Sequence, residues 1–239
     1  MSDVLTRDDL LTEDPAPSRQ LPLPLSLRGV SKAWEKGRVP VLDRVDLDLD
    51  VGAKVRVAGR NGVGKTTLMR IAAGLIDPDE GRAEVWGFAA AEHPQRYQRL
   101  VSFLPAGDRG LYARLSVRRQ LDFWARIAMV PRREVAARVE EAIETFDLRE
   151  LADRRVDRMS MGQRQRLRIA MTFLPRPDVV LLDEPLTSLD GEGAQLLYAA
   201  IERLLDEGGA VLWCSPAGEH LEYEFDRTCF LDGGRLVEA

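Results

Sequence analysis

A glycine-rich segment of this chain carries the residue types that phosphate binding requires. Its residues are Gly59, Arg60, Asn61, Gly62, Val63, Gly64, Lys65, Thr66 and Thr67. The glycines let the backbone turn with its N–H groups inward, and a following helix adds the positive end of its dipole. At this spacing Lys65 would reach the β- and γ-phosphates of a nucleotide, and Thr66 would ligate Mg²⁺. An apolar strand pattern before the segment and a helical pattern after it favour a nucleotide site over an empty glycine-rich turn.

Two acidic residues follow a second apolar segment. Residues 179–182 are all apolar, and Asp183 and Glu184 come next. This pattern is typical of a buried parallel strand that presents carboxylates at its carboxyl end. Beside a phosphate-binding loop, Asp183 is expected to hold Mg²⁺ and Glu184 to accept a proton from an attacking water. A simple acidic turn is the alternative interpretation.

A serine-containing segment precedes the helix predicted at residues 164–174. Ser160 and Gln163 have the spacing of a capping box, which satisfies the first N–H groups of a helix. A helix N-terminus with a serine and a nearby glycine, here Gly162, can also bind a phosphate end-on. From these residues alone, both interpretations stay open.

Composition limits the classes of protein to which the chain can belong. Its 239 residues, 45% of them hydrophobic, are enough for one good core. A net charge of −5 argues against broad nucleic-acid binding. The two cysteines, Cys214 and Cys229, lie in apolar runs and are expected to be reduced core residues. Without a long apolar run or a leader pattern at the N-terminus, any work at a membrane is expected to need a partner.

Strand and helix patterns alternate along most of the chain. Residues 1–24 are acidic and proline-rich, which predicts a mobile arm, and residues 25–239 are expected to form the folded domain. Helical spacing between about 107 and 162 predicts a helical insertion. The sequence thus predicts an α/β fold with a mainly parallel sheet, a strand-rich N-terminal part and an inserted helical part.

Taken together, the motifs resemble those of the ATP-binding cassette (ABC) ATPases, the nucleotide-binding subunits of ABC transporters. The resemblance rests on the glycine-rich loop, Met159–Gln163, Asp183-Glu184-Pro185 and Ser188-Leu189-Asp190 in the order of the family. It implies a P-loop ABC ATPase fold with an antiparallel β subdomain and a helical subdomain. It also implies a head-to-tail dimer that holds ATP between the P-loop of one subunit and the signature sequence of the other. The signature residues would be Ser160, Met161, Gly162 and Gln163.

The same resemblance implies further roles for single residues and for partners. Trp34 matches the aromatic residue that stacks on adenine, although a core position is the alternative. Asp190 matches the aspartate of a loop that crosses the dimer interface, and residues 107–155 match the region that docks a transmembrane permease. Residues 107–124 are similar to those of ABC-2-type exporter cassettes, which favours export. The resemblance also implies ATP and Mg²⁺ as ligands and a second ATPase subunit as a partner. It implies no nucleic-acid partner and a place on the cytoplasmic face of the membrane.

Two positions depart from the family pattern. Ala106 stands where the family usually has a glutamine near Mg²⁺ and the attacking water, and Pro216 stands where it has a γ-phosphate-binding histidine. Asp108 and His220 lie close enough in sequence to be candidate substitutes. We therefore expect tight binding of Mg-ATP with slow or partner-dependent turnover. Alternatives are an ATP-gated switch or the weak half of a heterodimer, and a cassette acting on DNA or ribosomes is disfavoured.

Overall fold

An antiparallel sheet forms the N-terminal part of the fold. The structure, a computed structural model, describes residues 22–34 and 39–238, so most of the predicted arm lies outside the described residues. The sheet has the order β2-β1-β4-β5. Its strands are β1 (Leu25–Lys32), β2 (Leu42–Leu49), β4 (Glu80–Val85) and β5 (Phe88–Ala89). Apolar residues of β1 and β2 point into the protein, whereas the aspartates of β2 lie on its wetter face.

The central sheet has the order β10-β9-β3-β8-β7-β6. Pairing is parallel throughout except between β10 and β9, so the predicted mainly parallel sheet is confirmed. Its strands are β3 (Lys54–Gly59), β6 (Val101–Leu104), β7 (Val179–Asp183), β8 (Ala210–Pro216), β9 (Arg227–Asp232) and β10 (Arg235–Glu238). Strand β7 is buried along its whole length, as its run of apolar residues predicts.

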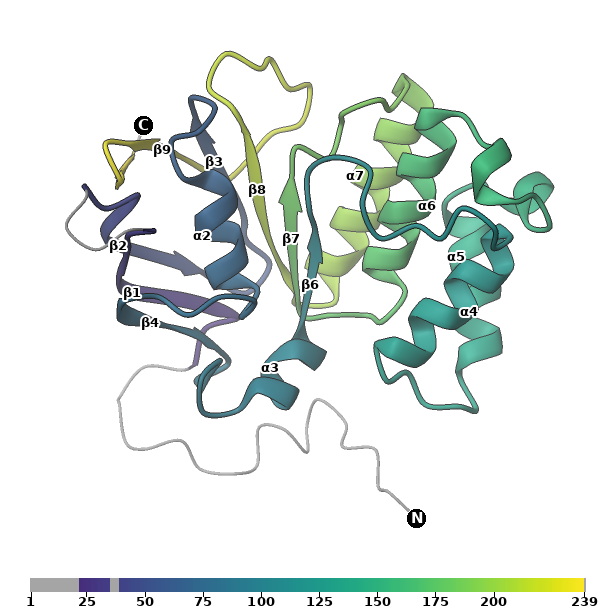
Figure 1. The fold of residues 1–239 in the computed structure, drawn as a ribbon, viewed down its shortest axis with the longest axis horizontal. Coiled ribbons are helices and arrows are strands. Elements are labelled where there is room, and N and C mark those ends of the chain that lie inside the picture. The colour runs from purple at the N-terminus through teal and green to yellow at the C-terminus, as the bar shows by residue number, and fades with distance from the viewer. Residues whose placement is uncertain (1–21, 35–38, 239) are drawn as a thin grey trace.

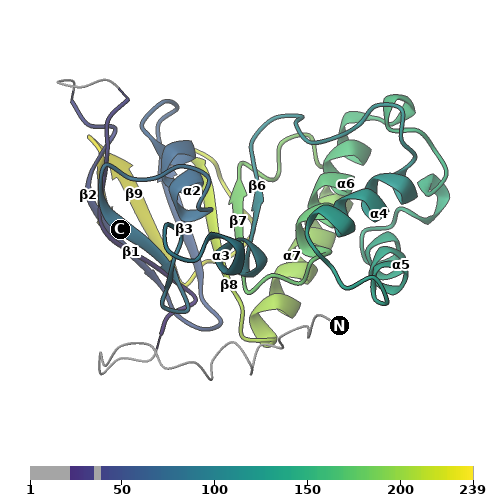
Figure 2. The same cartoon turned by 60° about the horizontal axis from the view of Figure 1, so that its bottom comes forward.

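Helices cover both faces of the central sheet (Figure 1). Helix α2 (Lys65–Ala72) lies between the two sheets and packs in one hydrophobic core with both of them. The second core joins the other face of the sheet to the remaining large helices. These are α4 (Val117–Ile127), α5 (Val135–Thr145), α6 (Met161–Phe173) and α7 (Gly191–Asp206). Figure 2 shows α2 and α3 (Pro94–Leu100) on the opposite side of the central sheet from α4, α5, α6 and α7.

Helices α4, α5 and α6 occur in the chain between β6 and β7, two strands that pair directly. This part of the chain therefore leaves the sheet at Leu104 and returns to it at Val179. The bounds of 107–162 given above for a separate helical subdomain stay a prediction.

The register of the central sheet brings several loops to one edge. Gly59 pairs with Pro216, Asp183 with Cys214, and Leu104 with Leu182. Because these strands are parallel, the segments that follow β3, β6, β7 and β8 all emerge at their carboxyl ends. The glycine-rich loop, the acidic pair and both departures from the family pattern therefore lie on the same edge.

Local details differ from the sequence-based expectations in two places. The alternating pattern predicted Val51 on the buried face of a strand, but β2 ends at Leu49 and the Val51 side chain is exposed in a turn. Gly52, in the left-handed region at φ +74°, provides that turn. Helix α3 was not predicted. The two cysteines are free and buried, as expected, and none of the described helices is long and apolar enough to cross a membrane.

Tyr97 offers a test of how the end of α2 is held. Its side chain is fully buried, and its hydroxyl donates to the Ala72 carbonyl at 2.7 Å. We expect Tyr97→Phe to lower the free energy of unfolding by about 1–3 kcal/mol, because a buried carbonyl loses its partner. The melting temperature should fall by about 2–4 °C per kcal/mol in a chain of this size. Tyr112→Phe, at an exposed tyrosine, is the matched control, and equal losses in the two variants would contradict this account.

Candidate nucleotide-binding site

The glycine-rich loop connects β3 to α2 in a conformation that only glycine adopts easily. Gly62 has φ +80° and Gly64 has φ +119°, both outside the usual range of residues with a side chain. A Cβ atom at Gly64 would also lie 2.9 Å from the Val41 carbonyl oxygen. The sequence therefore folds here into a tight turn that directs the N-terminus of α2 toward the loop, an arrangement suited to anions.

Lys65, the first residue of α2, donates hydrogen bonds to the loop. Its side chain is only 5% exposed, and Nζ donates to the carbonyl oxygens of Gly59 at 2.8 Å and Arg60 at 3.2 Å. These carbonyl contacts hold a positive charge beneath the turn. The charge is thus already at the loop when an anion enters.

A hydrogen bond joins the next residue of α2 to the end of β7. Thr66 Oγ1 donates to Asp183 Oδ2 at 2.8 Å. Asp183 is 2% exposed. Burial raises the pKa of this carboxyl group, the Glu184 charge raises it further, and the bond from Thr66 opposes both. A buried carboxylate therefore lies directly beside the glycine-rich loop.

Glu184 is held in an uncommon backbone conformation. Its φ is +51°, in the left-handed region that costs a residue with a side chain about 1–2 kcal/mol. The Glu184 N–H donates to the Cys214 carbonyl at 2.9 Å, so β8 fixes the conformation. Such local strain is frequent where a structure must direct a side chain into a functional site.

An open cleft of about 340 Å³ brings many of the predicted residues together. It is lined by Trp34, Val41, Asn61, Gly62, Gly64, Lys65, Thr66, Thr67 and Glu184. Trp34 is 57% exposed at the mouth of the cleft, with Lys32 Nζ 5.9 Å from its ring centroid. The alternative that Trp34 is a core residue is therefore excluded. Asp183 lies behind the cleft, in contact with Thr66.

The predicted signature residues lie at the N-terminus of α6, away from this cleft. Ser160 and Gln163 form the predicted capping box, with bonds of 3.2 Å and 3.0 Å. Met161 is 61% exposed. A Cβ atom at Gly162 would lie 2.9 Å from the Ser188 carbonyl oxygen, so glycine allows the two loops to approach each other. Asp190 caps α7 by accepting from the Gly193 N–H at 2.8 Å.

The two candidate substitutes for the missing side chains do not reach the cleft. Asp108 forms an ion pair with Arg164 at 3.3 Å, and His220 is exposed and does not line the cleft. Arg56 of β3 donates to Ser215 Oγ at 2.8 Å and to the Glu219 carbonyl at 2.9 Å, which fixes the loop after β8. Sequence reasoning missed Arg56. An arginine between two buried valines, Val55 and Val57, was the available signal.

Comparisons with known proteins give the same family as the motifs. The family model described as ABC transporter matches residues 42–187. The ABC transporter ATP-binding protein NatA of Bacillus subtilis is 31% identical over 203 residues, covering 85% of this chain and 82% of that protein. The daunorubicin resistance ATP-binding protein DrrA3 of Streptomyces coeruleorubidus is 32% identical over 213 residues, covering 89% of this chain and 66% of that protein.

Solved structures of ATP-binding cassettes share the fold. An ATP-binding subunit of an ABC transporter superposes with a TM-score of 0.81 at 24% identity, covering 92% of this chain and 90% of that one. A dimeric post-hydrolysis cassette with bound ADP and phosphate has a TM-score of 0.77 at 21% identity, covering 90% of this chain and 97% of that one. The predicted ABC ATPase fold is thus confirmed, and this chain belongs to the family of ABC transporter ATP-binding subunits.

Proposed function

We propose that this chain hydrolyses ATP to drive export through a separate transmembrane subunit. The observation that carries the proposal is the cleft in which the glycine-rich loop, the Thr66–Asp183 pair and Glu184 meet. ATP binding belongs to the family. The individual roles, the direction of transport and the coupling to a permease are the steps proposed here.

Nucleotide would be bound by the loop backbone from Gly59 to Thr67, by Lys65 and by the exposed ring of Trp34. The backbone N–H groups and Lys65 would neutralise the phosphates, and the indole would stack on the base. Trp34 already stands at the mouth of the cleft with its ring exposed.

Thr66 and Asp183 fit a magnesium site. No group of at least three His, Cys, Asp or Glu side chains that could hold a metal occurs among the described residues. Mg²⁺ does not need one, since it is usually held by one or two side chains, phosphate oxygens and waters. The hydroxyl and the buried carboxylate supply oxygen ligands of the right kind, 2.8 Å apart. A bound Mg²⁺ would stabilise the developing negative charge on the phosphates.

Glu184 is the proposed general base. Its backbone conformation directs it into the cleft, where it would accept a proton from the attacking water. Ala106 offers no side-chain hydrogen bond to that water, and Pro216 offers neither a side-chain nor a backbone donor. Loss of one transition-state hydrogen bond costs on the order of a hundredfold in rate, which supports slow or partner-dependent turnover.

The signature residues are proposed to act on the nucleotide of a second cassette. Ser160, Met161, Gly162 and Gln163 do not line the cleft of their own chain, and they form a helix N-terminus that suits a phosphate. Asp190 would lie at the same interface. One solved structure with this fold is a dimer with ADP and phosphate. Binding of ATP at both interfaces would favour the closed dimer.

Export is favoured by the printed functions of relatives. DrrA3 is a daunorubicin resistance protein, and the Nod factor export ATP-binding protein I of Ralstonia nicotianae is 30% identical over 213 residues, with 89% of this chain and 65% of that protein covered. A sulfate/thiosulfate import protein of Thermosynechococcus vestitus also matches, at 36% over 183 residues, covering 77% of this chain and 53% of that protein. Direction is therefore a proposal rather than a consequence of the family.

The permease is proposed to dock on the exposed aromatic residues of the helical part. Tyr112 packs edge-on against Phe123, with ring centroids 5.1 Å apart, yet both rings remain exposed. Ile127 lies one helical turn beyond Phe123 and is also exposed. We call Tyr112, Phe123 and Ile127 the docking face. Aromatic residues of this kind often supply much of the binding energy at a protein interface.

A second candidate function is an ATP-gated switch, or the weak half of a heterodimer. Ala106 and Pro216 favour it, because both remove hydrogen bonds near the reaction centre. Membership of the family does not distinguish the two, whereas turnover by the purified chain does.

Glu184→Gln tests the general base. We expect turnover of Mg-ATP to fall by about 10²–10⁴-fold, while ATP binding and ATP-dependent dimer formation persist. Steady-state phosphate release and light scattering measure the two properties. Glu192→Gln, an exposed glutamate in the first turn of α7, is the control. If the wild type binds ATP and dimerises without any turnover, the switch replaces the proposed hydrolase.

Asp183→Asn tests the electrostatics of the proposed magnesium site. Because the pKa of Asp183 is raised above 3.8, its ionisation lowers the stability of the folded protein as pH rises through that range. In EDTA without nucleotide, the variant should melt at a higher temperature than the wild type at neutral pH. The difference should shrink below about pH 4. The exposed Asp153→Asn is the control, and an unchanged or lower melting temperature for Asp183→Asn at neutral pH would refute this expectation.

Phe123→Ser tests the docking face. We expect retention of the permease during co-purification to fall at least about tenfold, because loss of a central aromatic anchor often costs more than 2 kcal/mol. Turnover by the isolated subunit should stay unchanged. Phe230→Ser is matched in type and exposure, 39% against 36%, but lies on β9. Equal loss of the permease in both variants would contradict the proposed position of the surface.

A further inference from the structure

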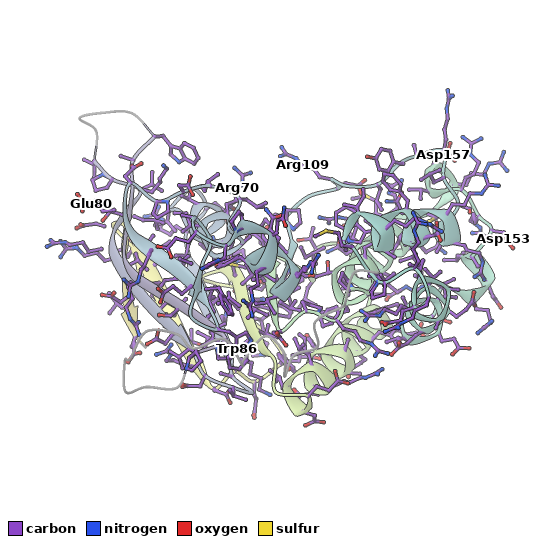
Figure 3. All side chains as sticks on the ribbon, turned by 90° about the horizontal axis from the view of Figure 1, so that it is seen from below. Arg70, Glu80, Trp86, Arg109, Asp153 and Asp157 are labelled. Atoms are coloured by element: carbon purple, nitrogen blue, oxygen red, sulfur yellow. The ribbon has the colours of Figure 1, made fainter. Side chains whose placement is uncertain are left out.

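The segment from Pro105 to Tyr112, which we call the crossing segment, leads from β6 to the helical part of the molecule. Figure 3 shows one of its residues, Arg109, on the stretch of chain between the sheets and the helical part. Outside the helices and strands, none of the described backbone–backbone hydrogen bonds involves residues 105–111. At Tyr112 only the carbonyl oxygen takes part in one, by accepting from the Leu115 N–H. The conformation of the crossing segment therefore depends on other contacts.

Gln120, in the first turn of α4, holds the far end of the crossing segment. Its Oε1 atom accepts a hydrogen bond from the Tyr112 N–H at 2.9 Å, and its Nε2 atom donates to the Gly110 carbonyl at 3.1 Å. The Gln120 side chain is fully buried. An amide group can accept and donate at the same time, so one side chain satisfies both backbone groups. An apolar side chain at this position could fill the space but would leave both groups without these partners.

Arg168 of α6 holds the near end of the crossing segment in a similar way. Its guanidinium group donates to the Pro105 carbonyl and, at 3.1 Å, to the Arg109 carbonyl. Arg168 is 4% exposed. Asp108, the acidic residue of the segment, forms its ion pair with Arg164 instead, at 3.3 Å. Two buried polar side chains from neighbouring helices thus bind the backbone at both ends of the segment.

The far end of the crossing segment carries one ring of the docking face. The Tyr112 ring packs edge-on against Phe123, with ring centroids 5.1 Å apart. Gln120 and Phe123 are three residues apart on α4 and are therefore neighbours on its surface. The helix that supplies the Phe123 ring thus also supplies the side chain that fixes the Tyr112 backbone. The position of the Tyr112 ring relative to Phe123 depends on that hydrogen bond.

We propose that Gln120 is a positioning residue for the docking face, which holds Tyr112 in its binding conformation before a partner arrives. The proposal rests on the permease-docking function proposed above. Ordering a loop or an exposed side chain during association reduces affinity, and a conformation that is fixed beforehand avoids this cost. Arg168 restricts the opposite end of the crossing segment, so the hydrogen bonds of Gln120 act on a short stretch of backbone.

Hydrogen exchange, followed by NMR in the isolated subunit without nucleotide, tests the positioning role. In Gln120→Met the side chain keeps its approximate size but loses both hydrogen bonds. The Tyr112 amide should then exchange at least about tenfold faster than in the wild type, with smaller changes in β7. Tyr97→Phe is the control, because it also removes a hydrogen bond from a buried side chain to a carbonyl oxygen, but on α3. It should leave exchange at Tyr112 near the wild-type rate.

Co-purification tests the consequence for the partner. Gln120→Met should lower retention of the permease several-fold, whereas Tyr97→Phe should retain it as the wild type does. Gln120→Asn keeps the amide group but is one methylene shorter, so we expect it to reach at most one of the two backbone groups. This variant should fall between the wild type and Gln120→Met in both measurements.

The outcomes separate this proposal from a purely structural role of Gln120. Exchange at Tyr112 with the wild-type rate in Gln120→Met would overturn it. Faster exchange at every protected amide, in proportion to a lower melting temperature, would overturn it as well. If Gln120→Met does not fold, the same comparison with Gln120→Asn decides.

Phe123→Ser separates failure of this proposal from failure of the docking function. If Phe123→Ser lowers permease retention but Gln120→Met does not, prior positioning of Tyr112 is rejected and the docking face is kept. If neither variant lowers retention while exchange at Tyr112 is locally faster in Gln120→Met, the docking face is rejected. The hold of Gln120 on the Tyr112 backbone is supported in that case.

Discussion

The hydrogen bond between Thr66 and Asp183 joins segments that lie 117 residues apart in the chain. It connects the first turn of α2 to the carboxyl end of β7, and it exists because parallel strands place their carboxyl ends on one edge. The glycine turn before α2 and the buried strand β7 bring its two partners together. Burial of Asp183 raises the pKa of its carboxyl group. Without a cation or nucleotide, the buried carboxylate therefore lowers the stability of the folded protein.

An arginine side chain holds each of the two loops that depart from the family pattern. At the loop after β6, the Arg168 side chain donates to the Pro105 carbonyl. At the loop after β8, Arg56 holds Ser215 and the Glu219 carbonyl. Fixing a loop through its carbonyls restricts its motion but supplies no new donor to a bound phosphate. This arrangement is compatible with the slow or partner-dependent turnover proposed above.

Sequence alone predicted the parts of the site that depend on local pattern. The glycine-rich loop, the capping box of Ser160 and Gln163 and the buried strand before Asp183 have signals within a few residues, because turn geometry, helix capping and burial impose them locally. Arg168, in contrast, has no local signal, because an arginine in a helix is usually exposed. Its partners lie about 60 residues away in the chain, and only tertiary packing reveals them. The exposed position of Val51 was missed for a related reason, since an alternating pattern continues into a turn without a change in polarity.

Helix α6 contacts two loops, the one that follows β6 and the one between β7 and α7. Gly162 lies against the Ser188 carbonyl, Gln165 bonds the Pro185 carbonyl, and Arg168 bonds the Pro105 carbonyl. Each contact involves backbone, so a shift of α6 cannot be absorbed by rotation of a flexible side chain in those loops. A ligand bound at the N-terminus of α6, as proposed above, would therefore act on the backbone next to Asp183 and Glu184. In a dimer closed by ATP, the signature of one subunit would adjust the acidic site of that same subunit while it binds the nucleotide of the other. These contacts of α6 alone would then couple the two nucleotide sites of the dimer.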